Sequence, residues 1–162
     1  KGADIVEINP SNEDFSQQPH HKIPPTILLN PSEDMKIMQE EIFGPVLPVK
    51  TYKDVSESVN YINSKDRPLG LYYFGEDTNE KEYVLDNTTS GGVTVNDVIS
   101  HIQMEDLPFG GVGPSGMGSY HGYDGFKEFS HAKAVYKQTK INLMKLGGLV
   151  PPYKKKEEKP SA

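Results

Sequence analysis

The chain has 162 residues, of which 35% are hydrophobic and 25% are charged, a composition typical of a globular protein with a modest core. Its formal net charge of −6 argues against a nucleic-acid partner, and no apolar run approaches the roughly 18–20 residues of a membrane span. The chain contains no cysteine, which excludes disulfides, thiolate metal sites and cysteine nucleophiles within it.

The first fifty residues predict strands with little helix between them. Residues 1–25 are polar and interrupted by prolines, so we expect irregular structure with room for one short strand. The apolar runs TILLN (26–30) and VLPVKTY (46–52) predict two strands, and Pro48 requires that the second be an edge strand or carry a bulge. Residues 32–41 between them predict one or two helical turns with Ser32 as N-cap.

The middle of the chain alternates helices and strands. The pattern predicts helices over 54–65 and 78–89 and strands over 69–76 and 92–97. Strands that alternate with amphipathic helices indicate crossover units, a parallel sheet and an α/β fold. Functional groups of such folds gather where the strands end, which here means residues 51–52, 75–76 and 96–97.

The last third is expected to be rich in loops. Residues 98–125 predict no long element, 123–130 predict a short helix, and 132–139 predict a late strand. The charged end, KKKEEKPSA (154–162), predicts a solvated, disordered tail.

The stretch GVGPSG (111–116) fits the spacing G-x-G-x-x-G of a dinucleotide-binding loop. Its surroundings argue against that interpretation, because Pro108 disfavours the strand that should precede the loop and Pro114 removes an N–H that could hold phosphate. We therefore favour a loop whose glycines determine its shape. A small independent dinucleotide-binding domain that uses this loop stays as a rival hypothesis.

Two further patterns carry candidate chemistry. In QEEIFGP (39–45), the adjacent carboxylates are typical of a solvated helix end, but a carboxylate and an aromatic two residues apart also suit a ribose and a flat ring. The histidines lack any metal-ligand spacing. His20 and His21 are predicted at the surface, whereas His121, close to the glycine loop, is a candidate for lining a pocket.

Two long motifs then identify a family. MQEEIFGPVLPV (38–49) and SGGVTVNDVISHIQMEDLPFGGVGPSGMGSYHGYDGFKEFSH (90–131) together resemble the C-terminal part of an aldehyde dehydrogenase. The likeness is greatest to the class 3 branch, which includes fatty-aldehyde and coniferyl-aldehyde dehydrogenases, and runs from about residue 20 to 140. It implies a three-layer catalytic domain with a parallel sheet over 1–131, an oligomerisation strand over 132–140 and a tail over 141–162.

The resemblance also implies roles for single residues. These enzymes oxidise aldehydes to carboxylic acids with NAD or NADP: a cysteine attacks the carbonyl, hydride passes to the nicotinamide, and a glutamate activates water. Glu41 resembles the residue that hydrogen-bonds the nicotinamide ribose, and Phe43 resembles the one that packs beside it. The residues that resemble the substrate tunnel are Ile99, Ile102, Gln103, Phe109 and His121, with Phe109 as its aromatic wall.

The same likeness implies that essential parts lie elsewhere. The nucleophilic cysteine, the water-activating glutamate and the nucleotide-binding domain would precede Lys1. We therefore expect this chain to be inactive alone and to belong to a cytoplasmic, homodimeric enzyme that acts on an apolar or aromatic aldehyde. No metal, membrane or nucleic acid is expected to take part. The alternative is a non-enzymatic binding or assembly module derived from this fold.

Overall fold

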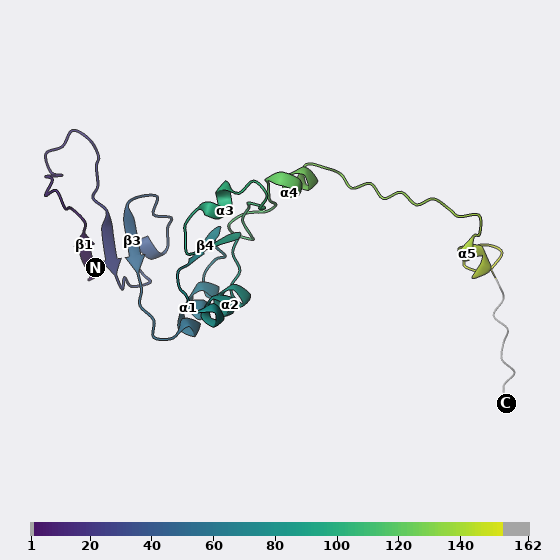
Figure 1. Ribbon diagram of the computed structural model, residues 1–162, viewed down its shortest axis with the longest axis horizontal. Helices are drawn as coiled ribbons and strands as arrows, with labels where there is room; N and C mark the ends of the chain where they lie inside the picture. The colour runs from purple at the N-terminus through teal and green to yellow at the C-terminus, as the bar shows by residue number, and fades with distance from the viewer. Residues whose placement is uncertain (1, 154–162) are drawn as a thin grey trace, which may run out of the picture.

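The computed structural model describes residues 2–153, so the predicted disordered tail at 154–162 lies outside the described part. Figure 1 shows a small sheet, a central body of helices and strands, and an extended arm, defined here as residues 131–153. The elements in chain order are β1 (Asp4–Glu7), β2 (Thr26–Leu29), η1 (Lys36–Met38), β3 (Val46–Val49), α1 (Val55–Asn63), β4 (Gly70–Tyr73), α2 (Thr78–Asn87), β5 (Gly92–Val95), α3 (Ser100–Gln103), α4 (Gly122–Glu128) and α5 (Leu143–Leu146).

The first sheet has the order β1-β2-β3, with β1 antiparallel and β3 parallel to β2. The strands predicted at 26–30 and 46–52 are confirmed, and Pro48 lies in an edge strand as its missing N–H requires. The helical turns predicted at 32–41 shorten to the single 3₁₀ turn η1, and the prediction of Ser32 as N-cap was wrong. The Ser32 hydroxyl donates instead to the neighbouring Asp34 carboxylate, and Met35 precedes the turn.

The second sheet consists of β4 and β5, which run parallel. Both strands were predicted, and so were the two helices beside them. The expectation that the strand at 46–52 joins them in one parallel sheet was wrong, because β3 pairs with β2 instead. Hydrophobic periodicity identifies a strand, but it does not identify the neighbour with which that strand forms hydrogen bonds.

The second sheet is the middle of three layers. On one face, Val59 of α1 and Val84 of α2 pack with Tyr73 of β4 to form the buried core, and Leu71 packs against them. Because side chains alternate along a strand, Gly70 and Tyr72 face the other side, where α3 lies. The α/β class is thus confirmed, and Figure 1 shows α1 and α2 on the opposite side of β4 from α3.

Two N-caps fix the starts of the core helices. The Asp54 carboxylate accepts a hydrogen bond from the Ser56 N–H, and Asp77 accepts from the N–H groups of Asn79 and Glu80. Each cap satisfies amides that a helix start otherwise leaves without partners, typically worth about 1 kcal/mol. These caps determine where α1 and α2 begin and so which residues reach the core.

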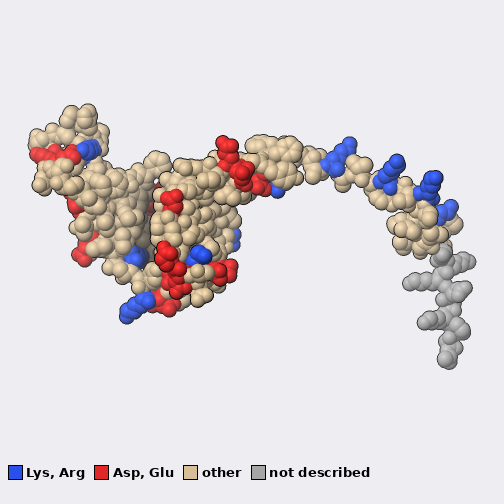
Figure 2. Space-filling view, viewed as in Figure 1, with Lys and Arg blue, Asp and Glu red and all other residues tan. Residues whose placement is uncertain are grey.

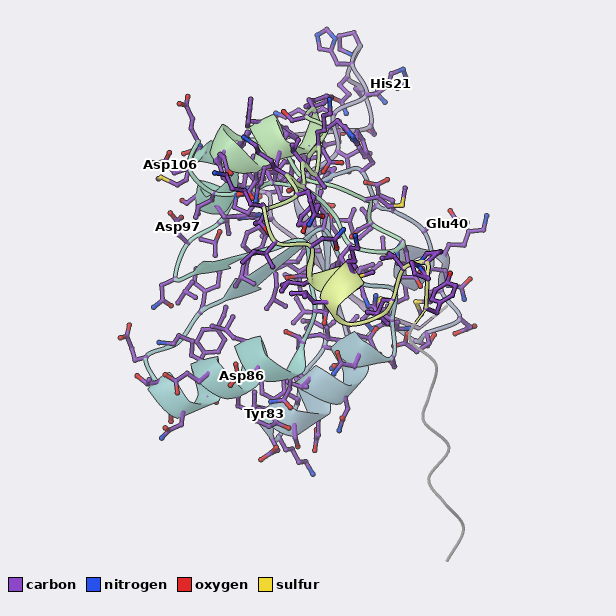
Figure 3. The ribbon with its side chains drawn as sticks, turned by 90° about the vertical axis from the view of Figure 1, so that its right-hand side faces the viewer. His21, Glu40, Tyr83, Asp86, Asp97 and Asp106 are labelled. Carbon is purple, nitrogen blue, oxygen red and sulfur yellow. The ribbon has the colours of Figure 1, made fainter. Side chains whose placement is uncertain are left out.

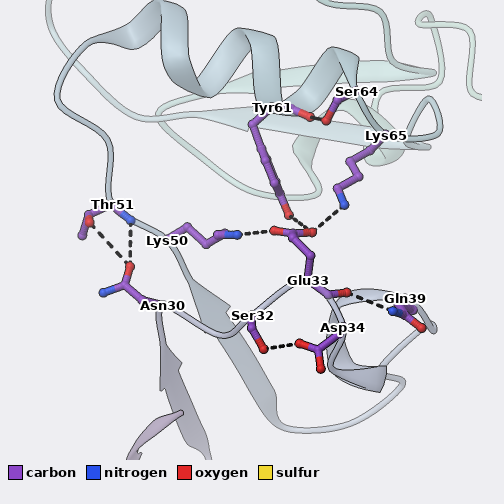
Figure 4. A network of polar contacts seen from close by, with 10 residues as sticks. All are labelled: Asn30, Ser32, Glu33, Asp34, Gln39, Lys50, Thr51, Tyr61, Ser64 and Lys65. Atoms are coloured by element: carbon purple, nitrogen blue, oxygen red, sulfur yellow. Dashed lines mark hydrogen bonds and ion pairs between the residues drawn. The ribbon is translucent and has the colours of Figure 1, made fainter. Parts of the chain in front are cut away.

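A polar network joins the first sheet to α1 (Figure 4). The carboxylate of Glu33, in the loop after β2, pairs with Lys50 just beyond β3 and with Lys65 just beyond α1, and accepts a hydrogen bond from Tyr61 at 3.3 Å. The hydrogen bonds from Lys50, Lys65 and Tyr61 lower the pKa of Glu33 to about 2, Lys50 having the largest effect. One carboxylate therefore holds three segments together.

The arm is extended, and most of it lies outside any helix or strand of the single chain. Residues 132–139 form no strand within this chain, because no hydrogen bond or ion pair joins residues 131–141 to the described residues before them, and a strand needs a neighbour to pair with. The short helix α5, capped by the Asn142 side chain, was not predicted. Figure 2 shows lysines along the arm and no acidic residue there. None of the helices in the described part is both long and apolar enough to span a membrane.

Candidate functional site

An aromatic cluster forms around Phe109. The backbone N–H of Phe109 donates to Tyr120 O, and the Tyr120 N–H donates to Phe109 O, both at 2.9 Å. The Phe109 ring meets the Tyr120 ring edge-on with centroids 5.6 Å apart and stacks on the His121 ring at 6.1 Å. The paired hydrogen bonds thus close the segment between Phe109 and Tyr120, and the Phe109 ring packs against two neighbouring rings.

The closed segment contains the glycine loop, whose turn is too tight for side chains. A Cβ added to Gly111 would lie 2.0 Å from the backbone oxygen of Ser115, and the Ser115 hydroxyl accepts from the Val112 N–H at 2.9 Å. No strand leads directly into the loop, since β5 ends at Val95, and helix α4 begins only at Gly122. The structure thus agrees with a shape-determining loop and lacks the strand–loop–helix context of a dinucleotide fingerprint.

One wall of a cavity of about 380 Å³ comes from this closed segment. Its lining includes Phe109 and Tyr120, and α4 contributes Glu128, followed by the exposed Phe129. The volume lies within the range of small-molecule sites, roughly 300–1,000 Å³. Phe109 therefore borders a hollow whose volume matches that of small-molecule sites.

The three tunnel candidates near α3 lie together just beyond β5, at the kind of position predicted for functional groups. Ile99 and Gln103 are exposed and Ile102 is half-buried. Ile99 has a φ of 66°, a left-handed conformation that is strained for a β-branched residue. The turn is held by Asp97, whose carboxylate accepts from the Ser100 hydroxyl and the Val98 N–H, and these bonds lower the pKa of Asp97.

The structure adds His101, which sequence reasoning did not single out. It is 7% exposed, its Nδ1 lies 2.6 Å from Thr94 Oγ1, and its ring centroid lies 6.2 Å from that of Phe109. The signal in the sequence was indirect: Gly70 and Gly92 pair across β4 and β5, and side chains missing at two paired positions leave space for a neighbour.

The predicted ribose contact lies on a different part of the chain. Glu41 and Phe43 border a cavity of about 350 Å³ between η1 and β3. Phe43 has a φ of 45° and is 94% exposed, and no hydrogen bond or ion pair within the described residues engages the Glu41 carboxylate. The structure does not bring these two residues together with the Phe109 cluster through any hydrogen bond or ring contact between described residues.

The remaining histidines take no part in either group. His20 and His21 are exposed, as predicted, and Figure 3 shows His21 projecting from the end of its loop, far from Asp97 and Asp106. Among the residues that the structure describes, no three His, Asp or Glu side chains are placed to hold a metal ion. The candidate site residues thus form two groups, Glu41 with Phe43 and the cluster around Phe109.

Comparison with known proteins decides the family. The model of the aldehyde dehydrogenase family matches residues 1–135. The chain belongs to the aldehyde dehydrogenase family. It is 66% identical over 153 residues to a probable coniferyl aldehyde dehydrogenase of Caulobacter vibrioides, which confirms the likeness seen in the motifs; the match covers 94% of this chain and 32% of that protein.

Solved structures of family members share the fold. The substrate-bound state of Staphylococcus aureus AldH matches with a TM-score of 0.70 at 44% identity, covering 82% of this chain and 28% of the other. A betaine aldehyde dehydrogenase variant of S. aureus in complex with NAD⁺ matches with a TM-score of 0.64 at 30% identity, covering 74% of this chain and 24% of the other. The chain spans about a third of the length of its Caulobacter relative.

Proposed function

We propose that this chain is part of an NAD(P)-dependent aldehyde dehydrogenase that oxidises an apolar or aromatic aldehyde to its carboxylic acid. The observation that carries the proposal is the Phe109 ring, packed against neighbouring rings beside a cavity of about 380 Å³, in a chain of this family. The coniferyl aldehyde dehydrogenase name of the Caulobacter relative supports an aromatic substrate. In this proposal Ile99, Ile102, Gln103 and His121 complete the surface that faces the aldehyde.

The residues at the second cavity fit the nicotinamide end of the cofactor. A ribose offers two vicinal hydroxyl donors, and Glu41 offers a carboxylate that no described residue engages. Each hydrogen bond from a ribose hydroxyl to this carboxylate would be charge-assisted, a kind of bond worth roughly 1.5–3 kcal/mol. The exposed Phe43 ring offers an apolar surface beside it. When bound, the nicotinamide would accept the hydride, while Glu41 and Phe43 restrict where its ribose lies.

The proposal assigns the remaining chemistry to segments outside this chain. Because the sequence contains no cysteine, the nucleophile must come from elsewhere in the complete enzyme, and the chain alone is inactive. Residues 1–131 belong to the catalytic domain, residues 132–140 pair with a second copy, and residues 141–162 form the tail of a cytoplasmic homodimer. A chain that serves only binding or assembly is the competing proposal.

The test compares the complete enzyme with its Phe109→Ala variant, following NAD(P)H formation with coniferyl aldehyde and with a short aliphatic aldehyde. We expect KM for the bulky aldehyde to rise roughly tenfold, which corresponds to about 1.4 kcal/mol of lost apolar contact, and to change little for the short one. The matched control is Phe15→Ala, an aromatic in the loop between β1 and β2. A complete enzyme that oxidises neither aldehyde would refute the proposed function and favour the assembly module.

A further inference from the structure

The geometry points to His101 as the residue that positions Phe109, and we propose that it thereby sets the enzyme's preference for bulky over small aldehydes. His101 borders neither of the two cavities described above. It acts through its neighbour, so it is a positioning residue and not a catalytic one. This inference rests on the proposed function, because selectivity has meaning only if Phe109 faces an aldehyde.

The His101 ring fills a gap on one face of the second sheet. Gly70 and Gly92 are directly paired in the register of β4 and β5, so neither strand presents a side chain at that level. A Cβ added to Gly92 would lie 2.5 Å from His101 Cδ2, and one added to Gly70 would lie 3.7 Å from His101 Cε1. The imidazole therefore sits directly over the two strand backbones, and a methyl group at Gly92 would force it outward.

The next pair along the same face holds the ring in its orientation. Tyr72 and Thr94 are register partners two residues beyond the glycines, and both contact His101. Thr94 Oγ1 accepts a hydrogen bond from the His101 N–H at 3.3 Å and lies 2.6 Å from Nδ1, while the Tyr72 ring centroid lies 6.0 Å from that of His101. One hydroxyl thus fixes both the backbone and the side chain of His101.

Through His101 this orientation reaches Phe109. The Phe109 ring contacts three rings, of which Tyr120 closes the segment with Phe109 and His121 follows Tyr120 directly. Among the described residues, His101 is the one ring partner of Phe109 that comes from a different element and is anchored on the sheet. A displaced imidazole would therefore let Phe109 and its loop shift together relative to β4 and β5.

The remaining ring nitrogen separates positioning from simple space-filling. His101 Nε2 is buried and has no hydrogen-bond partner among the described residues. The polar contact that orients the ring is therefore the one between Nδ1 and Thr94 Oγ1. A residue that only fills space could be replaced by any side chain of similar volume without changing selectivity. If the Thr94–Nδ1 contact orients the ring, its removal at unchanged volume should change where Phe109 lies.

The experiment uses Thr94→Val, which removes the hydroxyl at nearly constant volume, and His101→Asn, which retains a polar group near the Nδ1 position but removes the ring. In the complete enzyme, we expect both variants to lower the ratio of kcat/KM for coniferyl aldehyde to that for a short aldehyde by roughly 3- to 10-fold. When Phe109→Ala is added to either variant, the combined change in this ratio should be smaller than the product of the two separate changes, because both substitutions act on one contact. The control His21→Asn, at an exposed loop, should leave the ratio unchanged.

A second measurement does not depend on activity. Hydrogen exchange followed by mass spectrometry on peptides spanning residues 105–121 reports on the Phe109 and Tyr120 amides, which hydrogen-bond to each other's carbonyls. In both variants these amide hydrogens should exchange several-fold faster than in the wild type. Unchanged exchange in Thr94→Val overturns the inference, as does an active variant with the wild-type selectivity ratio. If the complete enzyme oxidises no aldehyde, the proposed function and the selectivity claim fail together, while the exchange result still decides whether His101 positions Phe109.

Discussion

At the scale of single residues, the contacts that matter most join segments far apart in the sequence. Glu33 was not a candidate in the sequence, since nothing local distinguishes it from the other acidic residues near it. Its importance comes from Lys50 and Lys65, which the fold brings to its carboxylate from 17 and 32 residues away. His101 escaped detection for the same reason, because its partners lie on two strands. Glu41 and Phe43, by contrast, were found because their motif is contiguous.

The Glu33 network predicts a specific pH dependence. The pKa of Glu33 is about 2 in the folded chain against an ordinary value of 4.5, so its contribution to stability is present above pH 4.5 and is lost as the pH falls towards 2. We expect Glu33→Gln to be less stable than the wild type at neutral pH and the difference to shrink across this window. Urea unfolding midpoints measured at several pH values check this.

The matched control for Glu33 is Glu40→Gln, whose pair with Lys36 spans 4.0 Å between exposed side chains. Its unfolding midpoint should follow that of the wild type at each pH. Added salt should reduce the effect of Glu33→Gln, because the network is partly exposed and therefore screened. If the wild type and Glu33→Gln lost the same amount of stability between pH 4.5 and 2, the assignment of this pH dependence to Glu33 would be contradicted.

At the scale of elements, local signals predicted more than non-local ones did. The helix at 54–65 was identified from apolar residues that recur at helical spacing, and both core helices begin directly after an aspartate, Asp54 or Asp77, that caps them. The 3₁₀ turn η1 is shorter than expected, because the predicted cap Ser32 donates to Asp34 instead and the turn has no side-chain cap. The prolines at 108 and 114 predicted that the glycine loop is not a dinucleotide fingerprint. The close approach of the Gly111 and Ser115 backbones, however, is visible only in the structure.

That close approach gives a prediction for the loop as an element. Gly111 has no positive φ, so alanine is compatible with its backbone conformation, but the added Cβ would lie 2.0 Å from Ser115 O. We expect Gly111→Ala to open the loop and to lower the free energy of unfolding by about 1–3 kcal/mol, as overpacking does. Gly44→Ala, whose Cβ would meet only Ile42 O at 3.6 Å, should stay within about 0.5 kcal/mol of wild type in the same denaturant titrations. Equal stability of the two variants would show that the loop tolerates a side chain at position 111.

At the scale of the whole molecule, the division into two sheets and the exposed apolar surface could not be read from the pattern. The buried hydrophobic core of the described part consists of Val59, Tyr73 and Val84, whereas Phe43, Phe129 and Tyr136 are each more than four-fifths exposed. Apolar periodicity marks side chains that will be covered, but it does not say whether the cover comes from the same chain. The arm shows this most clearly, because its predicted strand has no neighbour here.

The arm therefore yields the prediction for the assembled protein. Val135 is 81% exposed, and its N–H forms no hydrogen bond to another described residue, so Val135→Pro should leave the stability of the single chain unchanged. If residues 132–139 pair with a second copy, the same proline removes a ladder hydrogen bond and should weaken dimerisation of the complete enzyme by at least about tenfold. Sedimentation velocity across a concentration series measures this. Val135→Thr, which keeps the N–H and the β-branched shape, should dimerise like the wild type. A Val135→Pro enzyme with the wild-type dissociation constant would contradict pairing through the Val135 N–H, because proline lacks the donor that such a ladder hydrogen bond needs.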